Sequence, residues 1–331
     1  KHGDSIAAIR PSGKTSKENR RSPQILSNAN MAVQTCFIVG VILRLALTAA
    51  ALVSVSGAAV PQASKGSKFA PMRLIPPQDT YVAGGQEARP YEFPWQVSLQ
   101  VFVQPLGFTE AKWVHNCSGS IVNDQWVVTA AHCVTVEDVP RYRIVAGAHN
   151  ASKQEATANT FAVSRLVIHP GYERKALQDD VAMVKVRGRF QLDNASASIA
   201  YLPSMSEADA FHNKTCIASG WGMTDIHKPP SDVLLKVSVP IVPNPQCTIA
   251  YRFVRYAHIT DTKMCAGRRD LAGFGTCSGD SGGPLMCYDE GILKVAGITS
   301  FAVICGSQHF PSVFSRVSHY KQWIDSVVAA V

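Results

Sequence analysis

Short segments of alternating apolar and polar residues recur from about residue 94 to about residue 316. The first of them, residues 94–101, reads PWQVSLQV and has the two-residue period of a half-buried strand. Residues 114–122 and 126–131 continue in the same style, and Gly, Asn, Asp and Pro separate successive segments. Because few stretches here have the period of a helix, we predict an all-β sandwich or barrel.

The last segment of the chain has the period of a helix instead. Ser318 is a residue type that caps helices, and the apolar residues after it share one helical face. These residues are Tyr320, Trp323, Ile324, Val327 and Val328. We therefore expect a C-terminal α-helix over about residues 318–329, packed on the second of the two barrels if there are two.

Charge divides the chain near residue 82. Residues 1–81 contain ten Lys or Arg against three Asp or Glu, whereas residues 82–331 contain 22 against 21. The net charge of +8 therefore belongs to the N-terminal part, and the rest offers no basic face for nucleic acid. A length of about 250 residues suits one large all-β unit or two packed barrels.

The N-terminal part divides into three segments by composition. Residues 1–30 are polar and basic, which predicts a disordered or spurious extension. Residues 31–59 are apolar and end in small residues, which predicts a signal peptide and a secreted protein. The alternative is an uncleaved membrane anchor, but Arg44 interrupts the apolar run at a cost of about 2.5–3.5 kcal/mol at a bilayer centre. Residues 60–81 have no run that could pack, and we interpret them as a propeptide.

Cysteine usage also indicates an oxidising compartment. Cys36 lies in the apolar leader, and the other eight cysteines form an even set between residues 117 and 305. In a secreted chain such a set favours disulfides, although spacing alone leaves their pairing open. A zinc site is disfavoured because the chain contains no close Cys-x-x-Cys pair.

Residues 275–285, GTCSGDSGGPL, place Ser281 between glycines and directly after Asp280. Glycines let the backbone adopt positive φ and direct its N–H groups at a bound oxygen. That environment suits a serine nucleophile whose substrate develops an oxyanion. The same stretch also fits a tight turn, so the choice depends on whether a base and an orienting acid exist elsewhere.

Two further motifs supply those groups. Residues 129–133, TAAHC, end a buried strand in a histidine, and residues 179–186, DDVAMVKV, place acids at the mouth of another strand. With GDSGGP at residues 279–284, these motifs resemble, in the same order, the trypsin/chymotrypsin family of serine peptidases. The resemblance covers about residues 82–331. It implies two packed antiparallel six-stranded β-barrels with a C-terminal α-helix, barrel 1 over about 97–195 and barrel 2 over about 200–316.

The resemblance also implies a catalytic triad. Ser281 would attack the peptide carbonyl, His132 would act as the base, and Asp180 would orient the imidazole. Asp180 is chosen over Asp179 because it directly precedes the Val-Ala-Met strand. This chemistry requires no cofactor and no metal. Taken singly, these residues also fit a core histidine, a strand-end cap and a turn.

Further roles follow from the same resemblance. The backbone N–H groups of Gly279 and Ser281 would form the oxyanion hole, and Ser300 would hydrogen-bond Asp180. The implied disulfides are Cys117–Cys133, Cys216–Cys287, Cys247–Cys265 and Cys277–Cys305. Histidines outside the motifs are interpreted as ordinary residues: His115, His149, His169 and His319.

Residues 82–88, VAGGQEA, resemble the mature N-terminus of the family. Cleavage after Tyr81 would free the α-amino group of Val82, which would pair with Asp280 and act as a switch. Val-Ala replaces the usual Ile-Val, and Tyr81 stands where a basic residue is commoner. We therefore expect a chymotrypsin-like activating peptidase rather than a trypsin-like one.

The expected substrate pocket contains no charge. By resemblance, Gly275 and Thr276 form its floor and Ala302 and Ser312 its walls, with Ser300 beside them and Phe301 replacing the usual Trp. Without a carboxylate at the floor, a Lys or Arg side chain would be buried unpaired. We therefore expect cleavage after hydrophobic residues, from Ala or Val up to Leu and Phe or Tyr.

Two surface features complete the sequence-based expectations. In the loop of residues 147–159, where many relatives bind calcium, Glu155 is the only acid, so we predict no calcium. Asn150, Asn194 and Asn213 lie in glycosylation sequons.

The chain is thus predicted to be a secreted, zymogen-activated serine endopeptidase that acts on proteins or peptides as a monomer. Two alternatives remain open. One is a non-enzymatic relative that uses the fold to bind a partner, and the other is a membrane-anchored peptidase.

Overall fold

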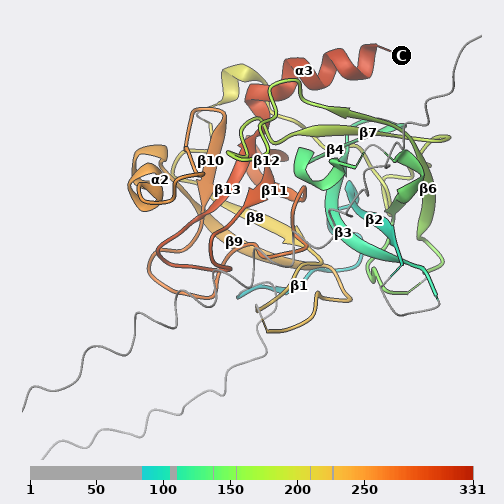
Figure 1. The fold of residues 1–331 in the computed structure, drawn as a ribbon, viewed down its shortest axis with the longest axis horizontal. Helices are drawn as coiled ribbons and strands as arrows, with labels where there is room; N and C mark the ends of the chain where they lie inside the picture. Colours follow the sequence, from blue (N-terminus) through green and yellow to red (C-terminus); the bar gives the residue numbers. More distant parts are fainter. Residues whose placement is uncertain are drawn as a thin grey trace, which may run out of the picture. The chain divides into compact units, whose positions relative to one another are not determined.

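The computed structural model describes residues 84–104, 110–136, 138–153, 155–208, 210–225 and 227–330 (Figure 1). Several expectations lie outside these residues. They are the extension at residues 1–30, the signal peptide at 31–59, the propeptide at 60–81, and Tyr81 and Val82 at the expected cleavage site.

The first barrel is closed by six antiparallel strands in the order β2-β3-β4-β7-β6-β5. Strand β4 is buried at every position, and the strands around it present buried Val, Ile and Leu to the barrel interior. The six strands are β2 (Gln96–Val103), β3 (Lys112–Ile121), β4 (Trp126–Thr129), β5 (Tyr142–Ala146), β6 (Asn159–Ile168) and β7 (Ala182–Val186).

The second barrel follows in the sequence and closes through the pairing of β8 with β9. Its strands run in the order β9-β10-β13-β12-β11-β8, and the short β1 adds to the edge of β9. The strands are β1 (Gln86–Glu87), β8 (Thr215–Gly220), β9 (Leu235–Val242), β10 (Lys263–Ala266), β11 (Pro284–Asp289), β12 (Ile292–Phe301) and β13 (Ser312–Arg316). The predicted fold class, two six-stranded β-barrels, is confirmed (Figure 1).

Two α-helices occur in the described part of the chain, α2 (Asn244–Tyr251) and α3 (Val317–Ala329). Three short 3-10 helices accompany them: η1 (Ala131–Val134), η2 (Val139–Arg141) and η3 (Met205–Glu207). Neither α-helix has both the length and the apolar character that a bilayer crossing requires.

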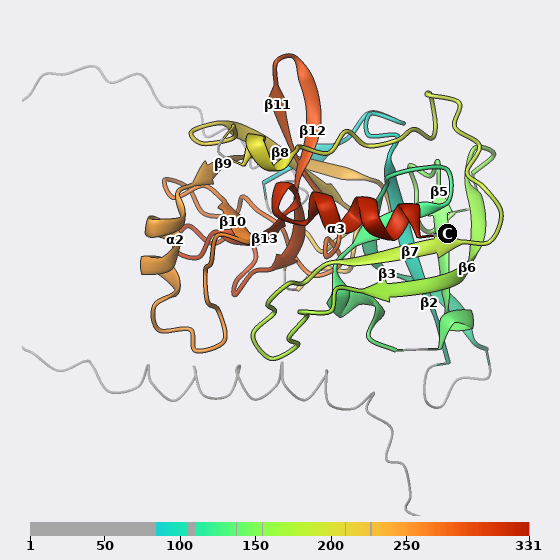
Figure 2. The ribbon, with the colours of Figure 1, turned by 90° about the horizontal axis from the view of Figure 1, so that it is seen from above.

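Helix α3 begins at Val317, one residue before its expected start. The expected cap at Ser318 is wrong, because Ser318 is buried within the first turn and Arg316 occupies the N-cap position without a side-chain cap. The apolar face is as expected, and its residues belong to a buried cluster that includes Val295 and Ile298 of β12 in barrel 2. Figure 2 shows α3 running from the end of β13 toward β7. The ring of His169 lies 4.9 Å from that of Trp323.

Four disulfides lie within the described residues. They join Cys117 to Cys133, Cys216 to Cys287, Cys247 to Cys265 and Cys277 to Cys305. These are the four pairs that the family resemblance implies. The first flanks His132, and the last closes the segment that carries Ser281.

Candidate active site

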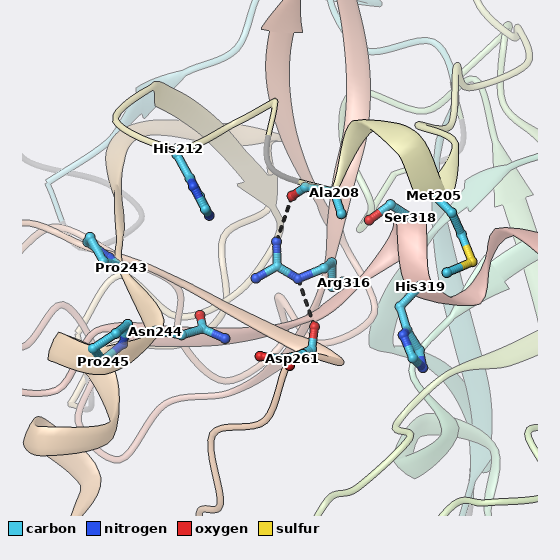
Figure 3. A pocket seen from close by; sticks show the side chains of 10 residues that line it. All are labelled: Met205, Ala208, His212, Pro243, Asn244, Pro245, Asp261, Arg316, Ser318 and His319. Atoms are coloured by element: carbon cyan, nitrogen blue, oxygen red, sulfur yellow. Dashed lines mark hydrogen bonds between the residues drawn. The ribbon is translucent and has the colours of Figure 1, made fainter.

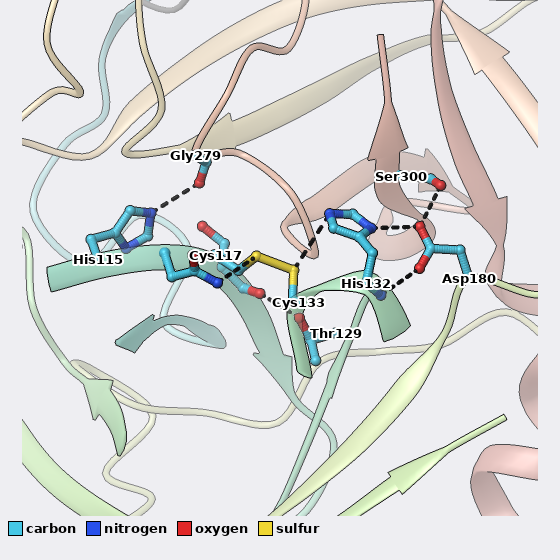
Figure 4. The surroundings of a disulfide bond; sticks show 10 residues. His115, Cys117, Thr129, His132, Cys133, Asp180, Gly279 and Ser300 are labelled. Atoms are coloured by element: carbon cyan, nitrogen blue, oxygen red, sulfur yellow. Dashed lines mark hydrogen bonds and ion pairs between the residues drawn. A yellow bond between two sulfur atoms is a disulfide. The ribbon is translucent and has the colours of Figure 1, made fainter. Parts of the chain in front are cut away.

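His132 lies in η1, directly after β4, and its side chain contacts Asp180 at the start of β7. The Nδ1 atom of His132 lies 2.8 Å from Oδ2 of Asp180, and the backbone N–H of His132 donates to Oδ1 at 2.9 Å (Figure 4). The Asp180 carboxylate is fully buried, whereas the imidazole is 25% exposed. A carboxylate only accepts hydrogen bonds, so Nδ1 carries the proton and Nε2 keeps a lone pair directed away from Asp180.

Two serines of barrel 2 also hold Asp180, although Asp180 itself belongs to barrel 1. The hydroxyl of Ser300 donates to Oδ2 at 2.5 Å, as the resemblance implies. The hydroxyl of Ser315 donates to the backbone carbonyl of Asp180 at 2.8 Å. Both oxygens of the carboxylate and the carbonyl of Asp180 therefore have fixed partners, which orients the carboxylate toward His132.

Ser281 is held against barrel 1 through its backbone and its neighbour. The backbone N–H of Ser118 donates to the Ser281 carbonyl at 2.7 Å. A Cβ on Gly282, whose φ is 75°, would collide with the Thr129 hydroxyl and would lie 3.1 Å from the backbone nitrogen of Ala130. Only glycine permits this approach, which brings Ser281 close to the segment that ends in His132.

The hydrogen bond between the Ser281 hydroxyl and His132 is not formed in the part of the chain that the structure describes. Instead, Nε2 of His132 lies 3.7 Å from the sulfur of Cys133 (Figure 4). Catalytic hydrogen bonds are often long or misaligned in enzymes without substrate, so this geometry does not exclude His132 as a base for Ser281.

Two backbone N–H groups around Ser281 have no acceptor among the described residues, those of Gly279 and Ser281. The neighbouring N–H groups do have acceptors: Asp280 donates to Cys277, and Gly282 donates to Thr299. Gly279 has a φ of 99°. The turn thus leaves two unpaired donors beside the serine hydroxyl, which is the requirement for an oxyanion hole.

Asp280 is buried beneath this turn. Its carboxylate accepts the backbone N–H groups of Gly222 and Cys277, each at 2.9 Å. Burial raises the pKa of Asp280 to about 6, and those two hydrogen bonds oppose the rise. No cation lies within ion-pair distance of Asp280 among the described residues, which do not include Val82.

A pocket of about 210 Å³ opens beside Ser281. No charged side chain is among the described residues that line it: Thr276, Cys277, Ser278, Ser281, Thr299, Ser300, Phe301, Ala302 and Cys305. Four of the expected pocket residues, Thr276, Ser300, Phe301 and Ala302, line this uncharged space. Gly275 and Ser312 are not among the lining residues, and the Ser312 hydroxyl accepts the Thr276 N–H at 3.2 Å.

His115 was expected to be an ordinary histidine, but it contacts the turn that carries Gly279. Its Nε2 donates to the Gly279 carbonyl at 2.9 Å, and its Nδ1 accepts from the Ser98 hydroxyl at 2.7 Å. Burial lowers the pKa of His115, which favours this neutral form. No motif marks His115, because its role depends on contacts between residues far apart in the chain.

Within the part of the chain that the structure describes, one group of side chains has ligand atoms close enough to hold a metal ion: Cys117, His132 and Cys133. The two sulfurs are bonded to each other, however, and therefore offer no thiolate. In the expected calcium loop, the Glu155 carboxylate accepts the backbone N–H groups of His149 and Asn150 at 2.5 and 3.0 Å. That single acid organises the loop through hydrogen bonds.

Comparison with known proteins gives a consistent result. The family model described as Trypsin matches residues 82–324. Chymotrypsin-like elastase family member 1 of Felis catus is 34% identical over 262 residues, 78% of this chain and 93% of that protein. The protein of the same name from Canis lupus familiaris is 32% identical over 260 residues, covering 77% of this chain and 95% of that protein. Coagulation factor XI of Bos taurus is 33% identical over 246 residues, which are 74% of this chain and 37% of that protein.

Proposed function

Since the chain belongs to the trypsin family and is a serine endopeptidase, we propose that Ser281, His132 and Asp180 are its catalytic residues. The observation that carries this proposal is the contact of a buried, fully hydrogen-bonded Asp180 with His132, at a position next to the Ser281 turn. The Ser281 turn contacts barrel 1 through the Ser118 N–H, which supports the proposal that the three motifs act together.

The proposed reaction proceeds through an acyl-enzyme. Nε2 of His132 takes the proton of the Ser281 hydroxyl as its oxygen attacks the peptide carbonyl carbon. The proton then passes to the leaving amine, the peptide C–N bond breaks, and the acyl group stays on Ser281. His132 then takes a proton from water as the water oxygen attacks the ester carbon. The ester C–O bond breaks, His132 returns the proton to the Ser281 oxygen, and the acyl product leaves as a carboxylic acid. Asp180 stabilises the imidazolium formed in both steps.

The N–H groups of Gly279 and Ser281 form the proposed oxyanion hole. They supply hydrogen bonds to the carbonyl oxygen as its negative charge develops, and each such donor stabilises the transition state by about 3–4 kcal/mol. His115 contributes indirectly, because its hydrogen bond fixes the peptide group between Gly279 and Asp280.

The proposed specificity is for hydrophobic residues on the acyl side of the cleaved bond. A lysine or arginine side chain in the pocket beside Ser281 would find no carboxylate among the described lining residues. Phe301 offers an apolar wall, and the small side chain of Ala302 beside it leaves moderate depth. This supports a range from Ala or Val to Leu and Phe or Tyr, the preference of elastase- and chymotrypsin-like enzymes.

We further propose activation by cleavage after Tyr81. Asp280 is buried and accepts only neutral N–H donors among the described residues, so it provides a site for a cation. The new α-amino group of Val82 would supply that charge and stabilise the turn carrying Gly279 and Ser281. Cleavage after Tyr81 requires an activating peptidase that accepts an aromatic residue.

Secretion and a monomeric state belong to the same proposal. Four disulfides within the described residues are typical of proteins that fold in an oxidising compartment. The substrates would then be extracellular proteins or peptides. N-terminal sequencing of the extracellular product tests this, since a start near residue 58 supports a cleaved signal peptide and retention of residues 1–30 supports a membrane anchor.

The deciding experiment uses protein cut after Tyr81, a panel of Ala-, Leu-, Phe- and Arg-ended peptide substrates, and a serine-directed phosphonate label. We expect hydrolysis of the apolar substrates and labelling of Ser281, with Ser281→Ala as the unlabelled control. Exclusive cleavage after Arg would contradict the pocket assignment. Failure of the label would contradict the assignment of Ser281 as the nucleophile and would favour the non-enzymatic alternative.

A further inference from the structure

Lys263, the first residue of β10, is a buried lysine. Its exposed fraction is 2%, and no carboxylate of the described residues lies within ion-pair distance of its ammonium. Lysine is rarely buried without a charged partner, because desolvation of the ammonium is unfavourable. Burial lowers the pKa of Lys263, and the charges of Asp180 and Asp179 oppose that shift from farther away. Because burial of its ammonium is unfavourable, we expect Lys263 to have a structural or functional role.

The Lys263 ammonium joins two loops on the same side of the candidate active site. It donates to the carbonyl of His258 at 2.7 Å, in the loop after α2, and to the carbonyl of Ala176 at 3.5 Å. It also lies 5.9 Å from the ring centre of Phe301 in the substrate pocket. Ala176 belongs to the hairpin that connects β6 to Asp180 and β7 within barrel 1.

That hairpin is conformationally strained directly before Asp180. Leu177 and Asp179 have φ values of 46° and 47°, in the left-handed region that side chains other than glycine disfavour. Such conformations persist only where surrounding contacts enforce them. Besides Lys263, side chains from other segments also hold the hairpin. Thr262 accepts a hydrogen bond from Gln178 at 3.0 Å, and the Tyr320 hydroxyl donates to the Asp179 carboxylate at 2.9 Å. The Nδ1 atom of His169 lies 3.9 Å from the same carboxylate.

The backbone of Lys263 is itself firmly anchored. It pairs directly with Ser315 of β13, and directly paired residues share a face of the sheet. The Ser315 hydroxyl reaches the Asp180 carbonyl from that face. The Arg316 guanidinium donates to the carbonyl of Lys263 at 3.0 Å, as well as to those of Asp261 and Ala208 (Figure 3). Lys263 therefore extends from a fixed point of barrel 2.

We propose that Lys263 is a positioning residue for Asp180, fastening the strained turn before it so that the carboxylate keeps its contact with His132. The inference rests on the proposed catalytic role of Asp180. Without the ammonium, the Ala176 carbonyl loses its anchor and the turn relaxes. The Asp180–His132 contact would then loosen, and the imidazolium formed in the transition state would be less stabilised. Substrate binding in the pocket beside Ser281 would be unaffected.

The test compares Lys263→Met, Lys263→Arg and Thr262→Val with Lys236→Met as the control. Lys236 lies in β9, is also largely buried, and pairs with Glu92 on another part of barrel 2. For folded Lys263→Met we expect kcat to fall about 10- to 100-fold with KM unchanged. Lys263→Arg keeps a cation, so its kcat should lie between those of Lys263→Met and the parent. Thr262→Val should lower kcat by a smaller factor than Lys263→Met does. The control, Lys236→Met, should have the kcat of the parent.

A second readout is the proton NMR signal of His132 Nδ1–H, which reports the contact with Asp180 without any turnover. We expect it to broaden or disappear in Lys263→Met and to persist in Lys236→Met.

Unchanged kcat and an unchanged NMR signal in Lys263→Met would overturn the proposal. A raised KM with unchanged kcat would also overturn it and assign Lys263 to support of Phe301. An inactive parent would refute the proposed function, whereas the signal would still decide the role of Lys263. If Lys263→Met does not fold, Lys263→Arg and Thr262→Val decide by the same two measurements.

Discussion

Ser315, in the last strand of barrel 2, donates a hydrogen bond to the backbone carbonyl of Asp180, which lies two residues before β7, the last strand of barrel 1. The Asp180 carboxylate in turn contacts His132 through both of its oxygens. The acid of the proposed triad is thus fixed by both barrels, and the following predictions test the consequences.

Asp180→Asn should lower kcat/KM about 10³- to 10⁴-fold, because the amide can donate to Nδ1 of His132 and so favour the wrong tautomer. Steady-state kinetics with an apolar substrate measures the loss. Asp179→Asn is the matched control, since asparagine tolerates the positive φ at that position. It should reduce kcat/KM by less than about tenfold. Equal losses in both variants would show that the wrong acid has been assigned.

Gly282→Ala should damage both stability and activity. The new methyl group meets the Thr129 hydroxyl and the Ser118 carbonyl, which displaces the turn carrying Ser281. We expect a loss of unfolding free energy of about 2–4 kcal/mol, from the unfavourable φ and the clash together. Chemical denaturation measures this loss.

Gly291→Ala is the control for Gly282→Ala. Gly291 has a similar φ of 79°, and its added Cβ would meet no heavy atom within 4 Å. Gly291→Ala should therefore lower the unfolding free energy only through the unfavourable positive φ, by about 1 kcal/mol. Its activity should equal that of the parent. If the two variants lost the same stability and the same activity, close packing of Gly282 would not be what holds Ser281.

Asp280 should make the uncut protein less stable as the pH rises from about 4 to 6. The ordinary pKa of an aspartate is 3.8, and burial raises that of Asp280 to about 6. The folded state therefore retains the proton to higher pH than the unfolded state, so its contribution is full below pH 4 and is lost above pH 6. The amplitude is about 3 kcal/mol, measured by urea denaturation across this range.

Asp280→Asn should remove this pH dependence, and so should cleavage after Tyr81 if the α-amino group of Val82 pairs with Asp280. Comparing the parent with Asp280→Asn and with the protein cut after Tyr81 separates the effect of Asp280 ionisation on stability from that of other groups. A cut protein whose stability still fell between pH 4 and 6 would argue against the pairing of Val82 with Asp280.

Ala302→Val should narrow the substrate pocket, because Ala302 lines it beside Phe301. We expect kcat/KM for Phe- and Leu-ended substrates to fall about 10- to 100-fold, while that for Ala-ended substrates changes little. The Ala-ended substrate is the internal control for correct folding. A uniform loss on all substrates would place Ala302 outside the specificity site.

Much of the fold and part of the site could be predicted from the sequence. Strand-period segments indicated a β-structure, and the motifs around His132, Asp180 and Ser281 indicated the family and hence its two barrels. Such patterns are local, or they repeat within a family, so a single sequence contains enough information to recognise them.

Other features depend on contacts that no local pattern encodes. Lys263 looks like an ordinary strand residue until Ala176 and His258 are placed around its ammonium. His115 gains its role only when the Gly279 carbonyl approaches it. The orientation of the imidazole likewise depends on its contact with Asp180, which is 48 residues away in the sequence.

Ser300 and Ser315, which hold Asp180 from the opposite barrel, have a consequence for how this protein loses activity under heat or denaturant. If the two barrels separate by even a small amount at their interface, Asp180 loses these hydrogen bonds before either barrel has unfolded. Loss of peptide hydrolysis would then precede the loss of strand structure seen by circular dichroism. The interface between the barrels, rather than the stability of either barrel, would set the rate at which the enzyme is inactivated.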